Sequence, residues 1–137
     1  MSEYAKPVPD ANAETAEFWD AAKRHEIALQ RCGGCGEVRH PPLPVCPKCH
    51  SWEFAWRVVG GEGKVESWIV VHHVVYPAFA PDAPYNVALV SLDDCPNVRL
   101  TTNIVGCDSA EIMIGMPVTA VFEDVTEQVT LIKFRPA

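Results

Sequence analysis

The sequence predicts a mainly β protein in which an N-terminal helix and a small cysteine-rich ribbon precede a five-stranded barrel. Three observations lead to this fold class. Apolar residues follow helical spacing before residue 26, two Cys-x-x-Cys pairs lie between residues 32 and 49, and β-branched runs broken by Gly and Pro fill the chain after residue 60. With 137 residues, 48% of them hydrophobic, the chain can form one domain, or one modest domain with a small module attached.

The first element expected is a short amphipathic helix. Residues 1–11 contain two prolines and small polar residues, which predicts an irregular lead-in. Asn12 can cap a helix over residues 13–25, whose apolar side carries Phe18 and Trp19. Two adjacent aromatic side chains on so short a helix indicate a docking face, either onto this chain or onto another one.

Four cysteines form the pattern C-x2-C-x10-C-x2-C, at Cys32, Cys35, Cys46 and Cys49. Two such pairs can place four thiolates around one tetrahedral ion, so the sequence predicts a rubredoxin-like zinc ribbon with one structural zinc per chain. A redox disulfide and a rubredoxin-type iron are the alternatives that this spacing leaves open. A closed four-cysteine site has no free coordination position, so we expect it to stabilise the fold and not to catalyse a reaction.

Short strands are expected on both sides of the cysteine pairs. Residues 26–31 alternate into the first pair, residues 39–44 form a loop stiffened by proline, and residues 51–59 alternate again. The strand at residues 51–59 is expected to have one buried face, formed by Trp52, Phe54, Trp56 and Val58.

The remainder of the chain has a strand-like pattern throughout. The expected strands are residues 64–75, 86–92, 98–105, 118–123 and 130–134. In the first of them, alternation places Val65 and Ile69 on one face and Trp68 on the other, and both faces are apolar enough to be covered over part of their length. Five short strands predict a closed or partly closed barrel of the OB type, although an SH3-like barrel fits the pattern nearly as well. The expected division of the chain is a helical segment at 1–30, the zinc ribbon at 31–59 and the barrel at 60–137.

Charge constrains the partners. The formal net charge is −7, but residues 23–64 contain seven Lys or Arg against four Glu, so this segment is +3 and the rest of the chain is −10. A chain this acidic is a poor general binder of nucleic acid, whereas a small phosphorylated ligand needs only two or three cations.

The same sequence predicts a cytoplasmic protein. The first 15 residues do not resemble a signal peptide, and no apolar run reaches the length of a membrane helix, so no membrane partner is expected. A reducing compartment favours metal over disulfides for the four clustered cysteines. Cys95 and Cys107 lie apart from them and are expected to be small packed side chains.

An ordered set of motifs resembles a known family, the zinc-ribbon and OB-fold proteins of domain-of-unknown-function family thirty-five. The set comprises Phe18-Trp19, Arg31-Cys32, Cys35-Gly36, Pro41-Pro42, Cys46-Pro47, Cys49, Gly61-x-Gly63-x-Val65-x-Ser67, Pro84-Tyr85-x-x-Ala88-Leu89-Val90 and Ile114-Gly115-Met116-Pro117-Val118. The resemblance covers residues 14–135. One departure is Leu43, which stands where members often have arginine after the proline pair; Arg39 can reach a similar region.

The resemblance implies a function. Members are small accessory subunits of thiolase-fold enzymes, retro-aldolases or hydratases that act on CoA thioesters, in lipid, steroid or aromatic degradation. The implied role is to dock a large subunit, as a heterodimer or heterotetramer, and to help form the channel for the pantetheine arm and acyl group of acyl-CoA. Catalytic Cys and His residues would belong to the large subunit. The residues that we expect to face the ligand or the partner are Phe18, Trp19, Arg39, Tyr76, Phe79 and Tyr85.

The sequence itself agrees with a role without catalytic residues. It contains no Ser-His-Asp set, no H-E-x-x-H motif and no phosphate-binding loop. His72 and His73 are adjacent in a predicted strand and would point to opposite faces, so they cannot hold one substrate atom together. The runner-up function is a module that binds single-stranded nucleic acid, because zinc ribbons and OB-folds both commonly do so. A stand-alone redox protein of the rubredoxin type is the third possibility.

Overall fold

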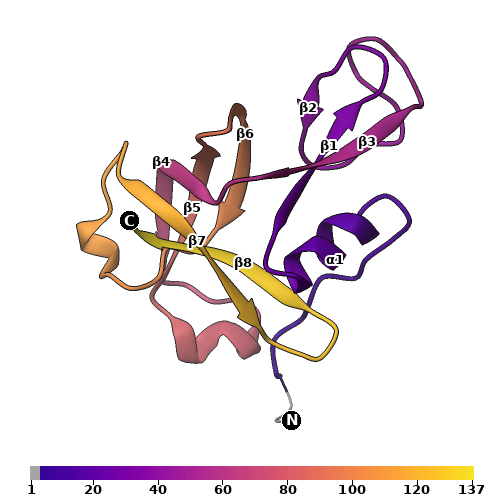
Figure 1. Ribbon diagram of the computed structural model, residues 1–137. Coiled ribbons are helices and arrows are strands. Elements are labelled where there is room, and N and C mark those ends of the chain that lie inside the picture. Colours follow the sequence, from indigo (N-terminus) through magenta and orange to yellow (C-terminus); the bar gives the residue numbers. More distant parts are fainter. Residues whose placement is uncertain (1–3) are drawn as a thin grey trace.

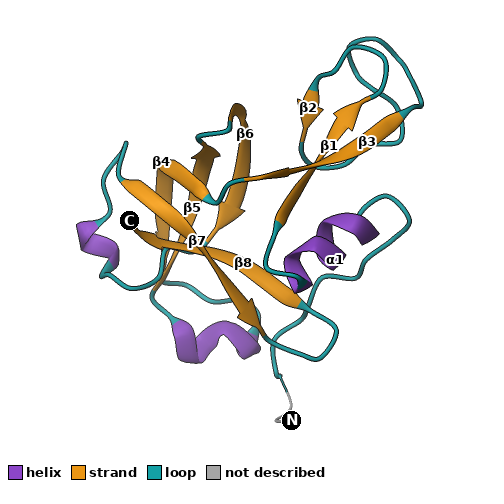
Figure 2. Cartoon of the chain, in the orientation of Figure 1, coloured by secondary structure: helices purple, strands orange, loops and turns teal. Residues whose placement is uncertain are grey.

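The computed structural model describes residues 4–137 as a two-sheet, mainly β molecule with one α-helix (Figures 1 and 2). The helix and strands are α1 (Ala16–Lys23), β1 (Ile27–Cys32), β2 (Val38–Arg39), β3 (Phe54–Val59), β4 (Glu62–Val71), β5 (Tyr85–Leu92), β6 (Cys95–Thr102), β7 (Pro117–Asp124) and β8 (Thr130–Pro136). Two 3₁₀ segments, η1 (Pro77–Asp82) and η2 (Ser109–Glu111), lie in the longer connections. None of the helices in residues 4–137 reaches the length and hydrophobicity of a membrane-spanning segment.

The larger sheet is a curled five-stranded half-barrel, as predicted. Its strand order is β6-β5-β4-β7-β8, with antiparallel pairing between neighbours. The two outer strands approach each other just beyond β6, where Ile104 forms a parallel bridge with Phe134. The backbone N–H of Val105 donates to the carbonyl of Phe134 at 2.8 Å there. Five short strands that curl until the outer two meet are typical of the OB-fold.

One hydrophobic core fills the half-barrel and extends beyond it. Alternate residues of β5 point inward, among them Val90 and Leu92, and pack with Phe134 of β8. Ile27 and Leu29 of β1 belong to the same buried cluster, although β1 is part of the smaller sheet. The ribbon is therefore packed into the barrel and not merely tethered to it. Figure 1 shows β1 and β3 running from the ribbon toward the barrel.

The smaller sheet has the order β2-β1-β3, and β3 forms one of its edges. The expected burial of the aromatic face of β3 is wrong. Trp52 is 72% exposed, Phe54 40% and Val58 55%. Period-two alternation identifies a strand, but whether a face is covered depends on what packs against it, and the described part of the chain leaves this one open.

The expected division of β4 into two faces is also wrong. Pairing with β5 shifts between Val65 and Ser67, so that Val65 lies opposite Val90 and Trp68 opposite Ala88. Val65 and Trp68 consequently share the core face, and Ile69 is 63% exposed. One extra residue in a strand reverses the side of every residue that follows, and nothing in the local alternation announced this bulge.

The element boundaries differ from the expected ones by a few residues. The helix begins at Ala16, because Asn12 caps a preceding turn through hydrogen bonds that its side-chain oxygen accepts from the N–H groups of Glu14 and Thr15. β4 begins at Glu62 and not at the expected residue 64, so Gly63 lies within the strand. A Cβ there would lie 2.5 Å from the carbonyl oxygen of Ser91, so this close crossing requires glycine.

Candidate metal centre and binding cavities

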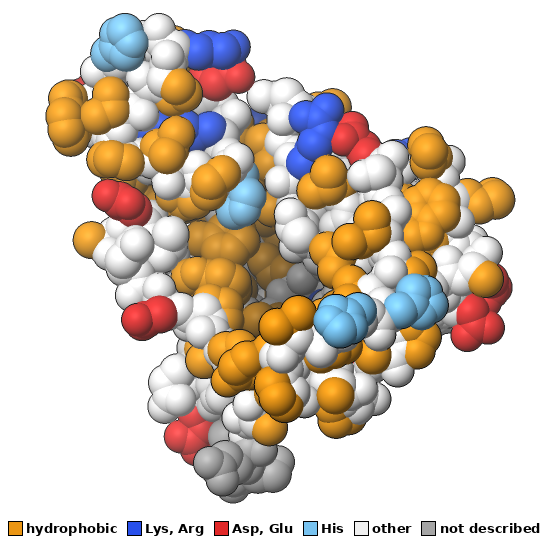
Figure 3. Space-filling model, turned by 180° about the vertical axis from the view of Figure 1, so that it is seen from behind, with side chains coloured by type: hydrophobic (Ala, Val, Ile, Leu, Met, Phe, Trp, Pro, Cys, Tyr) orange, Lys and Arg blue, Asp and Glu red, His pale blue; other side chains and the backbone are white. Residues whose placement is uncertain are grey.

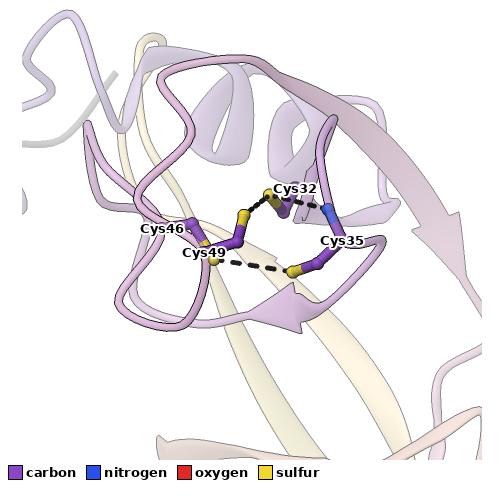
Figure 4. A group of neighbouring side chains, drawn as sticks. All are labelled: Cys32, Cys35, Cys46 and Cys49. Atoms are coloured by element: carbon purple, nitrogen blue, oxygen red, sulfur yellow. Dashed lines mark hydrogen bonds between the residues drawn. The ribbon is translucent and has the colours of Figure 1, made fainter.

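The four predicted metal ligands converge on one point between the loops of the ribbon (Figure 4). All four Sγ atoms lie within 4.8 Å of one another. Sγ of Cys32 is 3.4 Å from Sγ of Cys49, and Sγ of Cys35 is 3.7 Å from Sγ of Cys46. A tetrahedral ion bound at about 2.3 Å would place its sulfur ligands roughly 3.8 Å apart, which this spacing brackets. The site therefore fits one metal ion.

Backbone amides point at the first sulfur of each pair and favour its thiolate form. The N–H groups of Cys35 and Gly34 donate to Sγ of Cys32, at 3.4 and 3.3 Å. The hydrogen bond from Cys35 is the main reason that the pKa of the Cys32 thiol falls to about 6. The second pair repeats the arrangement, since a backbone hydrogen bond from Cys49 lowers the pKa of Cys46. Thiolates are the forms that bind metal. Each Cys-x-x-Cys pair therefore holds its first cysteine in the form that a metal ion requires.

An apolar cavity of about 530 Å³ lies where the helix, the ribbon and the barrel meet. Phe18 and Trp19 line it from α1, in an edge-to-face arrangement with their ring centroids 5.0 Å apart. His40 and Pro41 line it from the loop after β2, and the His40 ring lies 4.9 Å from that of Phe18. Burial lowers the pKa of His40, which favours its neutral form. Figure 3 shows a hollow in the molecule whose visible walls are mainly hydrophobic.

A second, more polar cavity of about 850 Å³ opens at the end of the barrel. Lys6 and Asp82 form an ion pair at its rim, and Lys133 pairs with Glu123 at 2.9 Å on another wall. Asn86 lies at its base, where the side chain donates to the carbonyl of Ile104 at 2.9 Å and accepts from the N–H of the same residue at 2.7 Å.

The two cavities share part of their lining. Thr101, Thr102, Asn103 and Lys133 border both. These residues come from the end of β6 and from the middle of β8, which are hydrogen-bonded through Thr102 Oγ1 and the carbonyl of Ile132 at 3.0 Å. A ligand that occupied both cavities would pass Lys133, whose side chain is 16% exposed.

The predicted ligand-facing or partner-facing residues fall into separate groups. Phe18 and Trp19 line the apolar cavity, while Phe79 and Tyr85 line the polar one. Tyr76 is 55% exposed and lies next to Phe79, with ring centroids 6.0 Å apart. The proline-rich connection around η1 thus brings its three aromatic rings together, but not to the helix pair.

Arg39 lies behind the apolar cavity and does not line it. It is 7% exposed, and its Nε donates to Oε1 of Gln30 at 2.6 Å. Its Nη2 donates to the carbonyl of Leu43 at 3.0 Å, and the N–H of Leu43 donates to the same Gln30 oxygen at 2.8 Å. This network fixes the loop that supplies His40 and Pro41 to the cavity wall.

Several cavity residues were missed by sequence reasoning. Lys6, Lys133 and His40 were not among the expected site residues, yet all three line a cavity. A lone lysine or histidine in a sequence gives no signal of a site when its neighbours come from distant segments. Cys107 also lines the polar cavity, but burial raises the pKa of its thiol, which makes it a poor nucleophile at neutral pH.

Comparison with known proteins agrees with this architecture in both parts of the chain. Residues 19–54 match the family described as the ChsH2 rubredoxin-like zinc ribbon domain, and residues 56–123 match the ChsH2 C-terminal OB-fold domain. A solved structure described as the Ltp2-ChsH2(DUF35) aldolase contains a similar chain. The TM-score is 0.84 at 42% identity, with 93% of this chain and 98% of that chain covered.

Two relatives illustrate the range of similar proteins. A DUF35 domain-containing scaffold protein of Methanocaldococcus jannaschii is 40% identical over 106 residues, which covers 77% of this chain and 73% of the relative. A probable enoyl-CoA hydratase alpha subunit of Thermomonospora curvata is 42% identical over 132 residues, or 96% of this chain. The chain spans 40% of the length of that alpha subunit.

Proposed function

This chain belongs to the DUF35 family of zinc-ribbon and OB-fold proteins, and we propose that it is a non-catalytic accessory subunit of a thiolase-like enzyme that acts on CoA thioesters. The observation that carries the proposal is the similarity, over nearly the whole of both chains, to a chain of the Ltp2-ChsH2(DUF35) aldolase. In this role the subunit docks a large subunit that supplies the catalytic residues. The single-stranded nucleic-acid module remains the alternative prediction.

The two adjoining cavities support a role in holding acyl-CoA. The apolar cavity between α1 and the loop after β2 suits an acyl group, because its walls include Phe18, Trp19 and Pro41. The polar cavity offers hydrogen-bonding groups for the pantetheine arm, among them the side chains of Asn86, Thr101 and Ser109. The chain would line one side of a channel and the large subunit the other.

The titratable groups of the cavities are engaged in ways that suit binding better than catalysis. Lys133 is paired with Glu123, and Lys6 with Asp82. Burial raises the pKa of the Cys107 thiol, so it is not prepared as a nucleophile, and Nδ1 of His40 is buried without a hydrogen-bond partner among the described residues that would orient the ring as a base. This is why we assign the reacting groups to the large subunit.

We assign a structural zinc to the four-cysteine site. Soft thiolate donors in a tetrahedral arrangement fit zinc or an iron–sulfur type of centre, and a reducing cytoplasm, the compartment that we propose, would keep the thiols free to bind it. The zinc would close the loops of the ribbon and contribute folding free energy. It would take no part in the reaction.

Co-expression with a thiolase-like protein encoded next to this chain tests the proposal. We expect the two to elute together in gel filtration, and a competitive acyl-CoA titration to give tighter binding for the complex than for the large subunit alone. Separate elution, together with full activity in the large subunit by itself, would contradict it. A parallel titration with short oligonucleotides at low salt tests the nucleic-acid alternative, which predicts tight, salt-sensitive binding.

A further inference from the structure

The outer edge of β3 is unpaired in the described part of the chain, residues 4–137. In the order β2-β1-β3, β3 pairs with β1 alone (Figure 1). Soluble proteins usually protect such an edge with lysine, proline, a bulge or a covering segment, because an open edge pairs with other chains. β3 has the sequence Phe-Ala-Trp-Arg-Val-Val, with no proline or lysine, and its register against β1 runs without a shift.

The hydrogen-bonding pattern between β1 and β3 determines which backbone groups of β3 point away from the sheet. The N–H of Gly33 donates to the carbonyl of Glu53 at 2.7 Å, in the same register as the β1–β3 pairs. Hydrogen-bonded and non-hydrogen-bonded pairs alternate in an antiparallel ladder. The backbone groups of Ala55 and Arg57 therefore face β1, whereas those of Phe54, Trp56 and Val58 point away from it. Three consecutive outward positions make a template for a further strand.

The side chains along this edge divide into an apolar face and a basic face. Phe54, Trp56 and Val58 share one face, and the rings of Phe54 and Trp56 meet edge to face at 6.0 Å. Arg57 lies on the other face, together with Arg31 of β1. Both arginines are exposed, and among the described residues neither forms a salt bridge. Nη1 of Arg57 donates to the sulfur of Cys95 at 3.5 Å. Nε of Arg31 donates to the carbonyl of Gly36 at 3.4 Å, so neither guanidinium has an acidic partner within residues 4–137.

We propose that the free edge of β3 accepts an extended segment of the large subunit as a further strand, one whose side chains are alternately apolar and acidic. This rests on the proposed function for the identity of the partner. The main chain of that segment would bond to the outward groups of Phe54, Trp56 and Val58. The apolar side chains of that segment would cover the apolar face of β3. Its acidic side chains would lie on the opposite face, where Arg57 and Arg31 are.

Charge favours this occupant over a second copy of the same chain. If two β3 strands paired with each other, each would bring its own Arg57 to an edge where the other Arg57 already lacks an acidic partner among the described residues. An acidic strand compensates those arginines. Main-chain pairing supplies affinity and the alternating side chains supply specificity, which is how added strands are recognised in general.

Substitution of Val58 by proline distinguishes docking through main-chain hydrogen bonds from docking through apolar side chains alone. Val58→Pro removes an N–H that points outward, so the β1–β3 ladder keeps its own bonds while an added strand loses a donor and meets the ring. Val58→Thr is the matched control, since it retains the N–H and β-branching. Arg57→Glu tests the charge independently, and is informative even if the proline variant proves unstable. Metal content and thermal unfolding establish that each variant is folded.

The measurement is the affinity of each purified variant for the large subunit by calorimetry. We expect Val58→Pro and Arg57→Glu each to weaken binding about tenfold or more, and Val58→Thr, which keeps the N–H, to weaken it clearly less than Val58→Pro does. If folded Val58→Pro and Arg57→Glu both bind like the wild type, the edge is not the docking site, although the proposed function stands. If the wild type itself does not bind the large subunit, the proposed function fails first. Should the variants instead abolish dimers of this chain, a second copy is the occupant and the inference is overturned.

Discussion

The metal centre shows how much a single cysteine can matter in a small module. Cys46 is fully buried, and its sulfur lies 3.7 Å from that of Cys35 in the other Cys-x-x-Cys pair. The ribbon around it has only two long strands and the two-residue β2. Few side chains between residues 33 and 53 are buried, so much of the stability of the loops that carry the cysteines must come from the bound ion.

Replacement of Cys46 by Ser should remove a ligand and unfold at least the ribbon. We expect the bound metal to fall from one equivalent to well below it, and the free energy of unfolding to drop by about 3 kcal/mol or more, a fraction of what structural zinc contributes in small modules. Elemental analysis and thermal unfolding measure both. Cys107→Ser is the control, because Cys107 lines the polar cavity and should leave the metal in place. A Cys46 variant with unchanged metal content and melting temperature would refute the four-cysteine assignment.

The sequence predicted the metal ligands but not the role of Arg39. Cysteine spacing is a local signal, since the convergence of two Cys-x-x-Cys pairs needs no knowledge of the rest of the fold. The position of Arg39 depends on contacts with Gln30 and Leu43, which no periodicity encodes. A charged residue beside a proline pair therefore looked like a ligand contact in the sequence, and in the structure it is buried and holds a loop.

At the scale of elements, His25, which lies just beyond the C-terminal end of α1, ties the helix to the β7–β8 hairpin. Nε2 of His25 lies 3.2 Å from Oδ1 of Asp124, and the hydroxyl of Thr130 donates to the same oxygen. The His25 ring also stacks on Phe122, with ring centroids 5.1 Å apart. The hydrogen bond from Thr130 comes first, and that with His25 second, among the causes that lower the pKa of Asp124.

Loss of the Thr130 hydroxyl should make this link sensitive to milder acid. Because the pKa of Asp124 is lower in the folded protein than in the unfolded chain, its contribution to stability is present above the unfolded value of about 3.9. That contribution is lost as the pH falls through the folded pKa. In Thr130→Val, of nearly equal size, we expect the pKa of Asp124 to rise toward the unfolded value, as measured by NMR titration of its carboxyl. Asp124→Asn should remove the titration altogether, and an unchanged pKa in Thr130→Val would show that the hydroxyl is not its cause.

Most helices and strands were predictable from the sequence, whereas the face of each strand that packs against the core was not. The β-branched runs identified all five barrel strands, because alternation and turn residues are local properties. The bulge near Glu66 changed which side of β4 meets the core, and it depends on pairing with β5. The two-residue β2 is too short to leave a periodic signal. In each case the missing information was a contact between distant segments.

At the scale of the whole molecule, the ribbon and the barrel share one core. Ile27 is 1% exposed, Leu29 is fully buried and Val59 is 8% exposed, and all three pack within the cluster that fills the half-barrel. Fully burying one such side chain contributes about 1.5–3 kcal/mol. The three together contribute roughly 5 kcal/mol or more, which is comparable with the total stability of many small domains, about 5–15 kcal/mol.

A chain reduced to residues 60–137 should therefore fail to fold, although it contains every strand of the half-barrel. It lacks the side chains of Ile27, Leu29 and Val59, so its core would have a cavity open to water where β1 now packs. Circular dichroism and thermal unfolding should show no cooperative transition for this fragment, whereas residues 13–137 should unfold in a single step.

By the same reasoning, removal of the metal by a chelator should lower the melting temperature of the whole protein and not of the ribbon alone. A fragment of residues 60–137 that unfolds cooperatively, or a chelated protein whose barrel melts at an unchanged temperature, would mean that the barrel is stable without the ribbon strands.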